Sequence, residues 1–444
     1  MSFVPLPEAR AGGNMNKRRS GWAAMVLLWP MTGQALEPPE RTWHSLARLE
    51  ATALTLWPRT GEEEAEGFAQ VEPTLIIDGG SEFGVSVGAP VRFRVQRGRE
   101  DSSLLRREDW DSLSDWGQLV RGLKFGSDRA PLRVWLGGFD GFTLLSGHLV
   151  RRYSNRAHPD EHPAGGFLAG TLGPLYTQAF TSDVLSARLM GAEVALDVAH
   201  VFWGRPREPG RYTLALSVVH DWDRAASVTL GHVDATAVVV VRPGFEAHVL
   251  AGWGWRPGAR GAWGAVVGVG ADALTSRLDA KLRLELRRQV GDFRQGFFGP
   301  DYELARLQAP GPEGRPLAEV TLPQGYSAFG EVEVGWDAES YGGTHRHLEL
   351  SLGVEGFSWG RVDVDGRLSV QLFERGLEVA LRCLSMGLGQ PGARYQGGAE
   401  VRWRFLGGGV YVLGTGGSRL FPNPEGGLGP RAFASVGLGV DHAR

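Results

Sequence analysis

The sequence has one cysteine, Cys383, among its 444 residues. A single cysteine excludes an intrachain disulfide and a metal site built from several thiolates. The chain also has no large excess of charge of one sign, because 47 Lys and Arg residues stand against 50 Asp and Glu residues. This balance gives no indication of nucleic-acid binding. After residue 35, no apolar run approaches the roughly 18 residues that indicate a membrane-spanning helix.

Glycine, by contrast, is abundant, with 65 residues, while proline accounts for only 25. Each glycine inside a helix costs about 1 kcal/mol relative to alanine, so a mainly helical protein is unfavourable. The mean hydropathy of −0.17 is too low for a bundle of membrane helices. This composition favours a large antiparallel β protein with many turns.

The N-terminal segment has the layout of a secretory signal peptide. Residues 17–19 are basic, residues 21–31 form a short apolar run, and Gly33 and Ala35 supply small residues before a cleavage point. We therefore predict that residues 1–35 are removed on export and that translation starts at Met15. A short buried helix is the alternative interpretation of the apolar run.

Most of the remaining chain alternates with a period of two. In residues 281–288, leucines occupy every second position and face away from Arg283, Glu285 and Arg287. Similar alternation occurs in residues 331–336, 347–354, 361–372, 377–383 and 401–405. Each such strand has one apolar face and one charged or small face.

The lengths of these segments favour a membrane barrel. They run for about 8–14 residues, and a membrane β-strand needs roughly 9–11, whereas strands of soluble proteins are most often about 5–6 residues long. We predict an all-β fold, a transmembrane antiparallel β-barrel of 16 or 18 strands over residues 71–444. Residues 36–70 are predicted to be a lead-in outside the barrel. A soluble β-sandwich remains the rival fold.

Two kinds of segment interrupt the strand pattern. Residues 106–125 carry apolar side chains at helical spacing and predict one short helix, placed in a periplasmic turn or in the lumen. Residues 154–166 and 291–315 are rich in glycine, proline and polar residues and predict loops. The segments 106–125 and 291–315 are the predicted constrictions if the barrel is hollow.

The signal peptide, the alternating strands and the aromatic residues near strand ends resemble bacterial outer-membrane β-barrel proteins of the porin-like kind. Residues 107–125 followed by residues 146–155 also resemble a pattern in uncharacterised barrels of this type. The resemblance implies the outer membrane of a Gram-negative bacterium, with outer-membrane lipid and the assembly machinery as partners. Such barrels usually end in an aromatic residue, whereas this chain ends in Arg444.

Charged residues on the polar faces of the strands are the candidate functional residues. In a membrane barrel they must line the interior, because an Arg or Lys facing the middle of the bilayer costs about 2–4 kcal/mol. They can set the ion preference of a pore, or they can neutralise one another in a filled lumen. The predicted pore-lining residues are Arg283, Glu285, Arg287, Glu331, Glu333, Glu349, Asp363, Asp365, Glu378, Arg382, Arg402 and Arg404.

The sequence carries none of the standard nucleotide-binding or hydrolase motifs. His200, Ser217 and the pair His220 and Asp221 are the residues from which an outer-membrane hydrolase could be built. Histidines at positions 158 and 162, and at 345 and 347, lack a standard spacing or a third ligand, so no metal or other cofactor is predicted.

We therefore expect a passive pore for small polar solutes. A non-conducting structural or binding barrel is the second hypothesis, and an outer-membrane hydrolase is the third.

Overall fold

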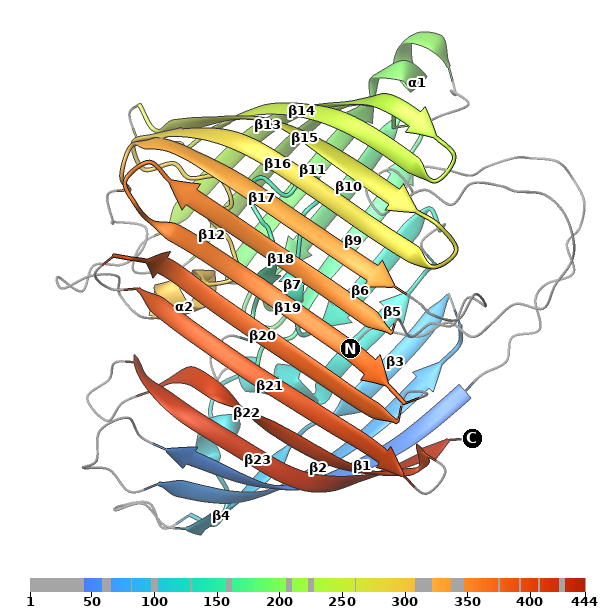
Figure 1. Ribbon diagram of the computed structural model, residues 1–444, viewed down its shortest axis with the longest axis vertical. Helices are drawn as coiled ribbons and strands as arrows, with labels where there is room; N and C mark the ends of the chain where they lie inside the picture. The colour runs from blue at the N-terminus through green and yellow to red at the C-terminus, as the bar shows by residue number, and fades with distance from the viewer. Residues whose placement is uncertain are drawn as a thin grey trace, which may run out of the picture.

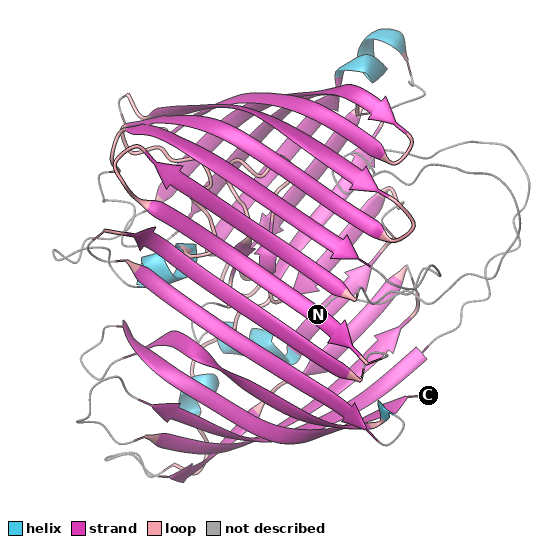
Figure 2. Ribbon diagram, viewed as in Figure 1, coloured by secondary structure: helices cyan, strands magenta, loops and turns pink. Residues whose placement is uncertain are grey.

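The structure is a computed structural model, and almost all of its regular structure is β-strand (Figure 2). It describes residues 44–57, 65–80, 82–96, 103–127, 130–156, 162–204, 210–222, 227–259, 261–307, 322–336, 347–373, 376–390, 393–405, 408–422 and 428–443. The predicted signal peptide lies outside the described residues.

The strands of the first half of the chain include several short ones. They are β1 (His44–Trp57), β2 (Glu66–Asp78), β3 (Phe83–Gly88), β4 (Val91–Gln96), β5 (Val120–Phe125), β6 (Leu132–Gly137), β7 (Asp140–Phe142), β8 (Tyr153–Ser154), β9 (Gly165–Leu172), β10 (Leu175–Thr181), β11 (Leu189–Asp197) and β12 (Tyr212–Asp221). The strands of the second half are uniformly long. They are β13 (Val228–Arg242), β14 (Phe245–Trp255), β15 (Trp263–Leu274), β16 (Leu278–Val290), β17 (Gly325–Trp336), β18 (Leu348–Phe357), β19 (Val362–Leu372), β20 (Leu377–Leu388), β21 (Arg394–Phe405), β22 (Val410–Pro422) and β23 (Leu428–Ala443).

The strands close into one antiparallel barrel (Figure 1). Neighbours in the barrel follow one another in the chain, and β1 pairs with β23 to complete the ring. Because β3 and β4 pair with successive parts of β2, they share one position. β7 and β8 pair only with each other, so the ring has 20 strands. The predicted all-β barrel is confirmed, but the predicted number of 16 or 18 strands was too low.

One of the strands that the sequence did not predict lies in the N-terminal region. β1 lies within the segment predicted to be a lead-in, yet it pairs along its length with β2 and β23. The prediction that residues 36–70 stay outside the barrel was therefore wrong. The polar composition of this strand resembles that of a loop because its inward face carries Arg48, Glu50 and Thr52. Arg48 and Glu50 make hydrogen bonds inside the barrel, and Thr52 is buried there.

The outer surface of the barrel is apolar, as the alternation predicted. Leu282, Leu284 and Leu286 of β16 point outward, and Leu286 is 66% exposed. Glu285 and Arg287 lie between them in sequence and are buried inside. A closed ring of strands with apolar residues outside satisfies every requirement for lipid contact. The chain is a closed antiparallel β-barrel with an apolar outer surface, the form in which β-strands can cross a membrane.

Helices are short and few. α1 (Val198–Trp203) connects β11 to β12, and α2 (Tyr302–Leu307) follows β16. In the described part of the chain, no helix is long and apolar enough to cross a membrane.

The segment predicted to be one helix, residues 106–125, contains two 3-10 helices, η2 (Arg107–Asp109) and η3 (Ser114–Leu119), and then β5. A helix extending to residue 125 was wrong, because Val120 already belongs to a strand. Just before η2, the backbone pairs with β4, with 2.8 Å between Arg94 N and Leu104 O. Leu113 and Trp116 are exposed while Asp115 is buried, as in the barrel wall. The segment therefore continues the wall beside β4 and is not a periplasmic turn.

The two ends of the barrel differ. At one end, the connections after β4, β6 and β16 are long. At the other end, β9 and β10, β13 and β14, and β15 and β16 are joined by two or three residues, and the longer connections there are the one with α1 and the 11 residues between β17 and β18. Since outer-membrane barrels have short periplasmic turns and longer extracellular loops, we assign the long connections to the extracellular end.

Candidate functional site: an inserted plug and the lumen beside it

Two of the long connections fold into the lumen. We call residues 138–156 and 291–307 together the plug. The first part contains the small hairpin of β7 and β8, and the second part ends in α2, which Figure 1 labels. Leu149, Val150 and Phe298 in the plug have almost no exposed surface. The plug is therefore a packed element and not a loose loop.

The two parts of the plug are hydrogen-bonded to each other. The backbone N–H of Gly296 donates to the carbonyl of His148 at 2.7 Å, and that of Phe298 donates to Leu149 at 3.1 Å. The hydroxyl of Tyr153 also donates to the carboxylate of Glu303. Although residues 138–156 and 291–307 are far apart in sequence, they behave as one body.

Glycines in the wall make room for the aromatic side chains of the plug. Phe293 lies against Gly254 of β14 and Gly264 of β15. A Cβ atom added to Gly254 would lie 2.1 Å from Cζ of Phe293, and one added to Gly264 would lie 2.5 Å from its Cδ1. These glycines are thus required by close packing, which accounts for part of the high glycine content.

We expect Gly254→Ala to loosen the plug, because the added methyl group overlaps the ring of Phe293. Overpacking of this kind costs about 1–3 kcal/mol, to be measured as a lower urea midpoint of the barrel in lipid vesicles. Gly356→Ala is the matched control, because a Cβ atom at Gly356 meets nothing within 4 Å. Equal midpoints for the two variants would show that Phe293 does not pack against this wall.

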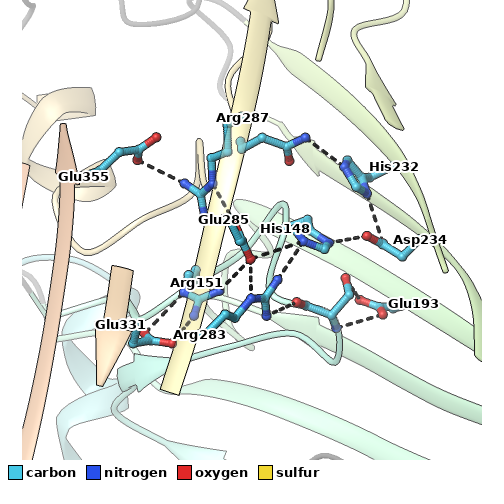
Figure 3. Close-up of polar contacts among 12 residues, drawn as sticks. His148, Arg151, Glu193, His232, Asp234, Arg283, Glu285, Arg287, Glu331 and Glu355 are labelled. Atoms are coloured by element: carbon cyan, nitrogen blue, oxygen red, sulfur yellow. Dashed lines mark hydrogen bonds and ion pairs between the residues drawn. The ribbon is translucent and has the colours of Figure 1, made fainter. Parts of the chain in front are cut away.

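Charged side chains of β16 form a polar network on the inner face of the wall and contact the plug (Figure 3). Arg287 donates to Glu285 at 2.7 Å and to Glu355 of β18 at 3.0 Å. Arg283 also pairs with Glu285 and donates to the backbone carbonyl of Ser146 in the plug at 2.8 Å. The side chain of Glu285 has 0% exposure, so its charge depends on these cations for compensation.

Further ion pairs join the plug to the next strands. Arg151 pairs with Glu331 of β17. Arg152 lies 2.6 Å from Asp365 of β19, measured from Nε to Oδ2. Nη2 of Arg294, in the second part of the plug, lies 2.6 Å from Oδ2 of Asp363 on β19. Five of the predicted pore-lining acids and arginines on β16 to β19 thus bind the plug and do not face open water.

A buried histidine cluster forms where the plug meets β13. Nδ1 of His148 pairs with the carboxylate of Asp234, and Nδ1 of His232 lies 3.0 Å from the other oxygen of that carboxylate. The three side chains have the spacing of metal ligands. However, Arg283 Nη2 lies 2.6 Å from Nε2 of His148. A guanidinium only donates, so Nε2 is the acceptor and the proton of the neutral imidazole lies on Nδ1, which faces the carboxylate of Asp234. A protonated nitrogen is not a metal ligand, so we assign the cluster to polar contacts that seat the plug.

The other predicted residues lie elsewhere in the lumen. Arg382 of β20 reaches Asp140 of the plug at 2.8 Å. Glu333 lies 3.7 Å from Lys281, and Glu349 is exposed near the periplasmic end of β18. The remaining three, on β20 and β21, make contacts that do not involve the plug: Glu378 with Arg402, and Arg404 with Asp441.

Part of the lumen remains in contact with water. The side chain of Arg382 is 58% exposed although it points inward, and that of Glu400 is 47% exposed. The contacts of the plug run from β5 round to β21. On β1, β22 and β23, inward polar groups such as Arg48 and Asp441 pair along the wall itself. The open space therefore lies between the plug and the wall formed by β20 to β23 and β1.

The residues considered for a hydrolase are not assembled into a catalytic site. The hydroxyl of Ser217 donates to the backbone carbonyl of His232. His220 shares its hydrogen bond with Thr229 at 2.7 Å, and Asp221 accepts from Tyr302 of the plug. His200 lies on α1, outside the lumen. The histidines at 158 and 345 lie outside the described residues.

Several residues that fix the plug were not predicted from the sequence. His148, Arg151 and Arg152 lie in a segment noted only for a resemblance, residues 146–155. Glu193 of β11 accepts from the backbone N–H and hydroxyl of Ser146. The sequence did contain one indication of the plug, namely a histidine and two arginines close together in a long connection. Charged residues in a connection that folds inward need partners on the wall.

No protein-family model and no curated protein matches this sequence. Among solved structures, OccAB2 of Acinetobacter baumannii is 9% identical, with a TM-score of 0.35, covering 90% of this chain and 98% of that chain. A BenF-like porin from Pseudomonas fluorescens Pf-5 is 9% identical, with a TM-score of 0.35 and coverage of 90% and 99%. OccK11 of Pseudomonas aeruginosa is 12% identical, with a TM-score of 0.34 and coverage of 90% and 96%. The function proposed below therefore rests on the geometry of this chain.

Proposed function

We propose that the protein is a passive channel for small polar solutes, with its passage between the plug and the wall of β20 to β23 and β1. The observation that carries this proposal is the exposure of Arg382. A charged side chain that points into a closed barrel and is still 58% exposed has water beside it. A barrel of this strand number has room for an aqueous lumen unless loops fill it.

The charges along this passage are mixed. Arg367 and Arg382 both reach Asp140, at 2.7 and 2.8 Å, and Glu378 and Glu400 lie nearby on β20 and β21. Fixed charges of both signs favour polar solutes over apolar ones. Glu333 and Glu349, nearer the end with the short turns, are also accessible to water.

A non-conducting barrel is the second candidate function, and the plug itself favours it. Its apolar contacts and buried ion pairs extend across the lumen from β6 to β19. In that case Arg382 lines a closed pocket, and the barrel serves a structural or binding role.

Recordings in planar bilayers test the proposal. We expect steady single-channel conductance from the native protein, and Arg382→Glu is expected to shift the reversal potential in a KCl gradient toward cation preference. Arg277→Glu, in an exposed turn between β15 and β16, is the control and should shift it little. A folded, heat-modifiable protein that never conducts would favour the non-conducting barrel.

A further inference from the structure

Arg288 of β16 points to the lipid side of the barrel and not into the lumen. Leu284 and Leu286 point outward, and the period of two places Arg288 on the same face. Its sequence neighbours Arg287 and Gln289 are each 3% exposed, on the inner face. Arg288 lies close to the end of β16 that leads into the long connection, which is the end assigned to the extracellular side.

The outer face around Arg288 is otherwise uncharged. β14 to β17 lie side by side in the wall (Figure 1), and β18 and β19 follow. In these six strands, the outward positions hold valine, leucine, alanine, glycine and aromatic residues, and every other Asp, Glu, Lys and Arg is at an inward position. An arginine that faces lipid is unfavourable unless its charge reaches the headgroup region. Arg288 is therefore an exception that needs a physical reason.

The guanidinium of Arg288 is stacked on an aromatic ring and has no ionic partner in the protein. Its carbon lies 4.4 Å from the ring centre of Tyr326, the cross-strand partner of Arg288 on β17. Within the described ranges, this stacking is its one interaction, and no carboxylate reaches it. Stacking occupies a face of the guanidinium, whereas its N–H donors lie along the edge. The edge is therefore available to a ligand.

A short side chain leaves room beside this edge. Ala265 of β15 pairs with Arg288 on one side and with Trp253 of β14 on the other. Trp253 is 50% exposed and stacks on Trp255, with 5.4 Å between the ring centres. Side chains of such cross-strand neighbours stand about 4.5–5.5 Å apart at Cβ. Because alanine ends at Cβ, the strand between the indole pair and the guanidinium does not cover the guanidinium at this register.

The level in the membrane indicates the kind of ligand. Trp253, Arg288 and Tyr326 all lie near the same end of their strands, and Tyr326 is 63% exposed. Exposed aromatic residues at strand ends mark the boundary between hydrocarbon and headgroups. Water also reaches this boundary, but it does not balance the charge, and no carboxylate of the surrounding wall does. A phosphate does both, because arginine binds it through paired, charge-assisted hydrogen bonds.

We propose that Arg288, Tyr326 and Trp253 form a binding site for the phosphate group of one anionic lipid on the outer surface of β14 to β17. The edge of the guanidinium binds the phosphate, the aromatic rings flank the headgroup, and the acyl chains follow the leucines of β16. The site lies on the outside of the wall and contacts neither the plug nor the passage. It is therefore independent of the proposed channel.

Native mass spectrometry of the full barrel in detergent measures the bound lipid. Dioleoyl phosphatidic acid and dioleoylglycerol are the probes, because they share their acyl chains and differ in the phosphate. We expect the native barrel to prefer phosphatidic acid, and Arg288→Gln to bind it about ten-fold more weakly, the loss typical of a hydrogen bond to a charged group. Arg277→Gln, in the exposed turn before β16, is the control and should keep the native affinity. Native affinity in Arg288→Gln overturns the proposal.

A second variant tests the geometry while the charge stays in place. Ala265→Trp covers the edge of the guanidinium and is expected to weaken phosphatidic acid binding as Arg288→Gln does. Ala273→Trp, at the other end of the same face of β15, is its control. Heat modifiability on gels verifies that each variant is folded.

Inorganic phosphate distinguishes a lipid site from a site for the free ion. We expect an equal concentration of phosphate to displace little phosphatidic acid, because the free ion lacks the acyl chains that contact the wall. Full displacement would show that the ion alone is the ligand and would overturn the assignment to a lipid.

Discussion

Removing the inner hairpin of the plug is expected to raise single-channel conductance several-fold. Residues 143–152 connect Phe142 to Tyr153, which are partners across β7 and β8. Replacing the whole connection by Asn-Gly therefore closes a two-residue hairpin turn without strain. The deletion removes Arg151, Arg152 and the buried apolar residues beside them, so water fills the space that they occupied.

The deletion also leaves wall acids such as Glu193, Glu285 and Glu331 without their plug partners. These carboxylates become hydrated, and two arginines that offset negative charge in the lumen are gone, so we expect the enlarged lumen to prefer cations. Planar-bilayer recordings measure both changes, with heat modifiability on gels as the check that the barrel has formed. Phe202→Ser is the control, because Phe202 lies on α1 and is 73% exposed. Unchanged conductance after the deletion would mean that this part of the plug does not occupy the conducting path.

Neutralising Glu285 is expected to produce the largest loss of stability of any single substitution in the lumen. Its carboxylate compensates Arg283 and Arg287 and lies 3.5 Å from Nε2 of His148. Glu285→Gln keeps the shape but removes the charge. Breaking a buried ion pair from one side costs about 3–5 kcal/mol, because the remaining charges are left uncompensated. Urea-induced unfolding in lipid vesicles measures the difference.

Glu333→Gln is the matched control for this loss. Glu333 belongs to the same set of inward acids, but its side chain is 44% exposed and lies 3.7 Å from Lys281. An exposed pair of this kind contributes only about 0–1 kcal/mol. Similar losses for the two variants would show that Glu285 is hydrated and that the plug is not seated against β16.

The sequence predicted which face of each strand meets lipid. In β16, Leu282, Leu284 and Leu286 alternate with Arg283, Glu285 and Arg287. Because successive side chains of a strand point to opposite faces, this alternation fixes which side of the strand faces outward. The same logic identified Glu285 and Arg382 as lumen residues. It did not separate them, because a buried ion pair and a water-exposed charge occupy equivalent positions in the alternation.

The alternation of polar and apolar residues did not predict two features of the structure, β1 and the plug. β1 was missed because its inward face is as polar as a loop, and its identity as a strand depends on pairing with β23 at the other end of the chain. The plug was missed because its contacts join residues such as Arg151 and Glu331, which are far apart in sequence. Local propensity carries no information about such pairs.

The sequence by itself determined a membrane barrel with charged residues inside, since alternation and glycine content act within each strand and its neighbour. Only the tertiary structure decided that the ring has 20 strands, that two long connections fold inward as one body, and which of the inward charges meet protein and which meet water. The physical reason is that the burial of a charge depends on the groups around it. Arg283 and Arg287 share β16 with Glu285, but His148 and Arg151 reach it only because residues 138–156 fold into the lumen.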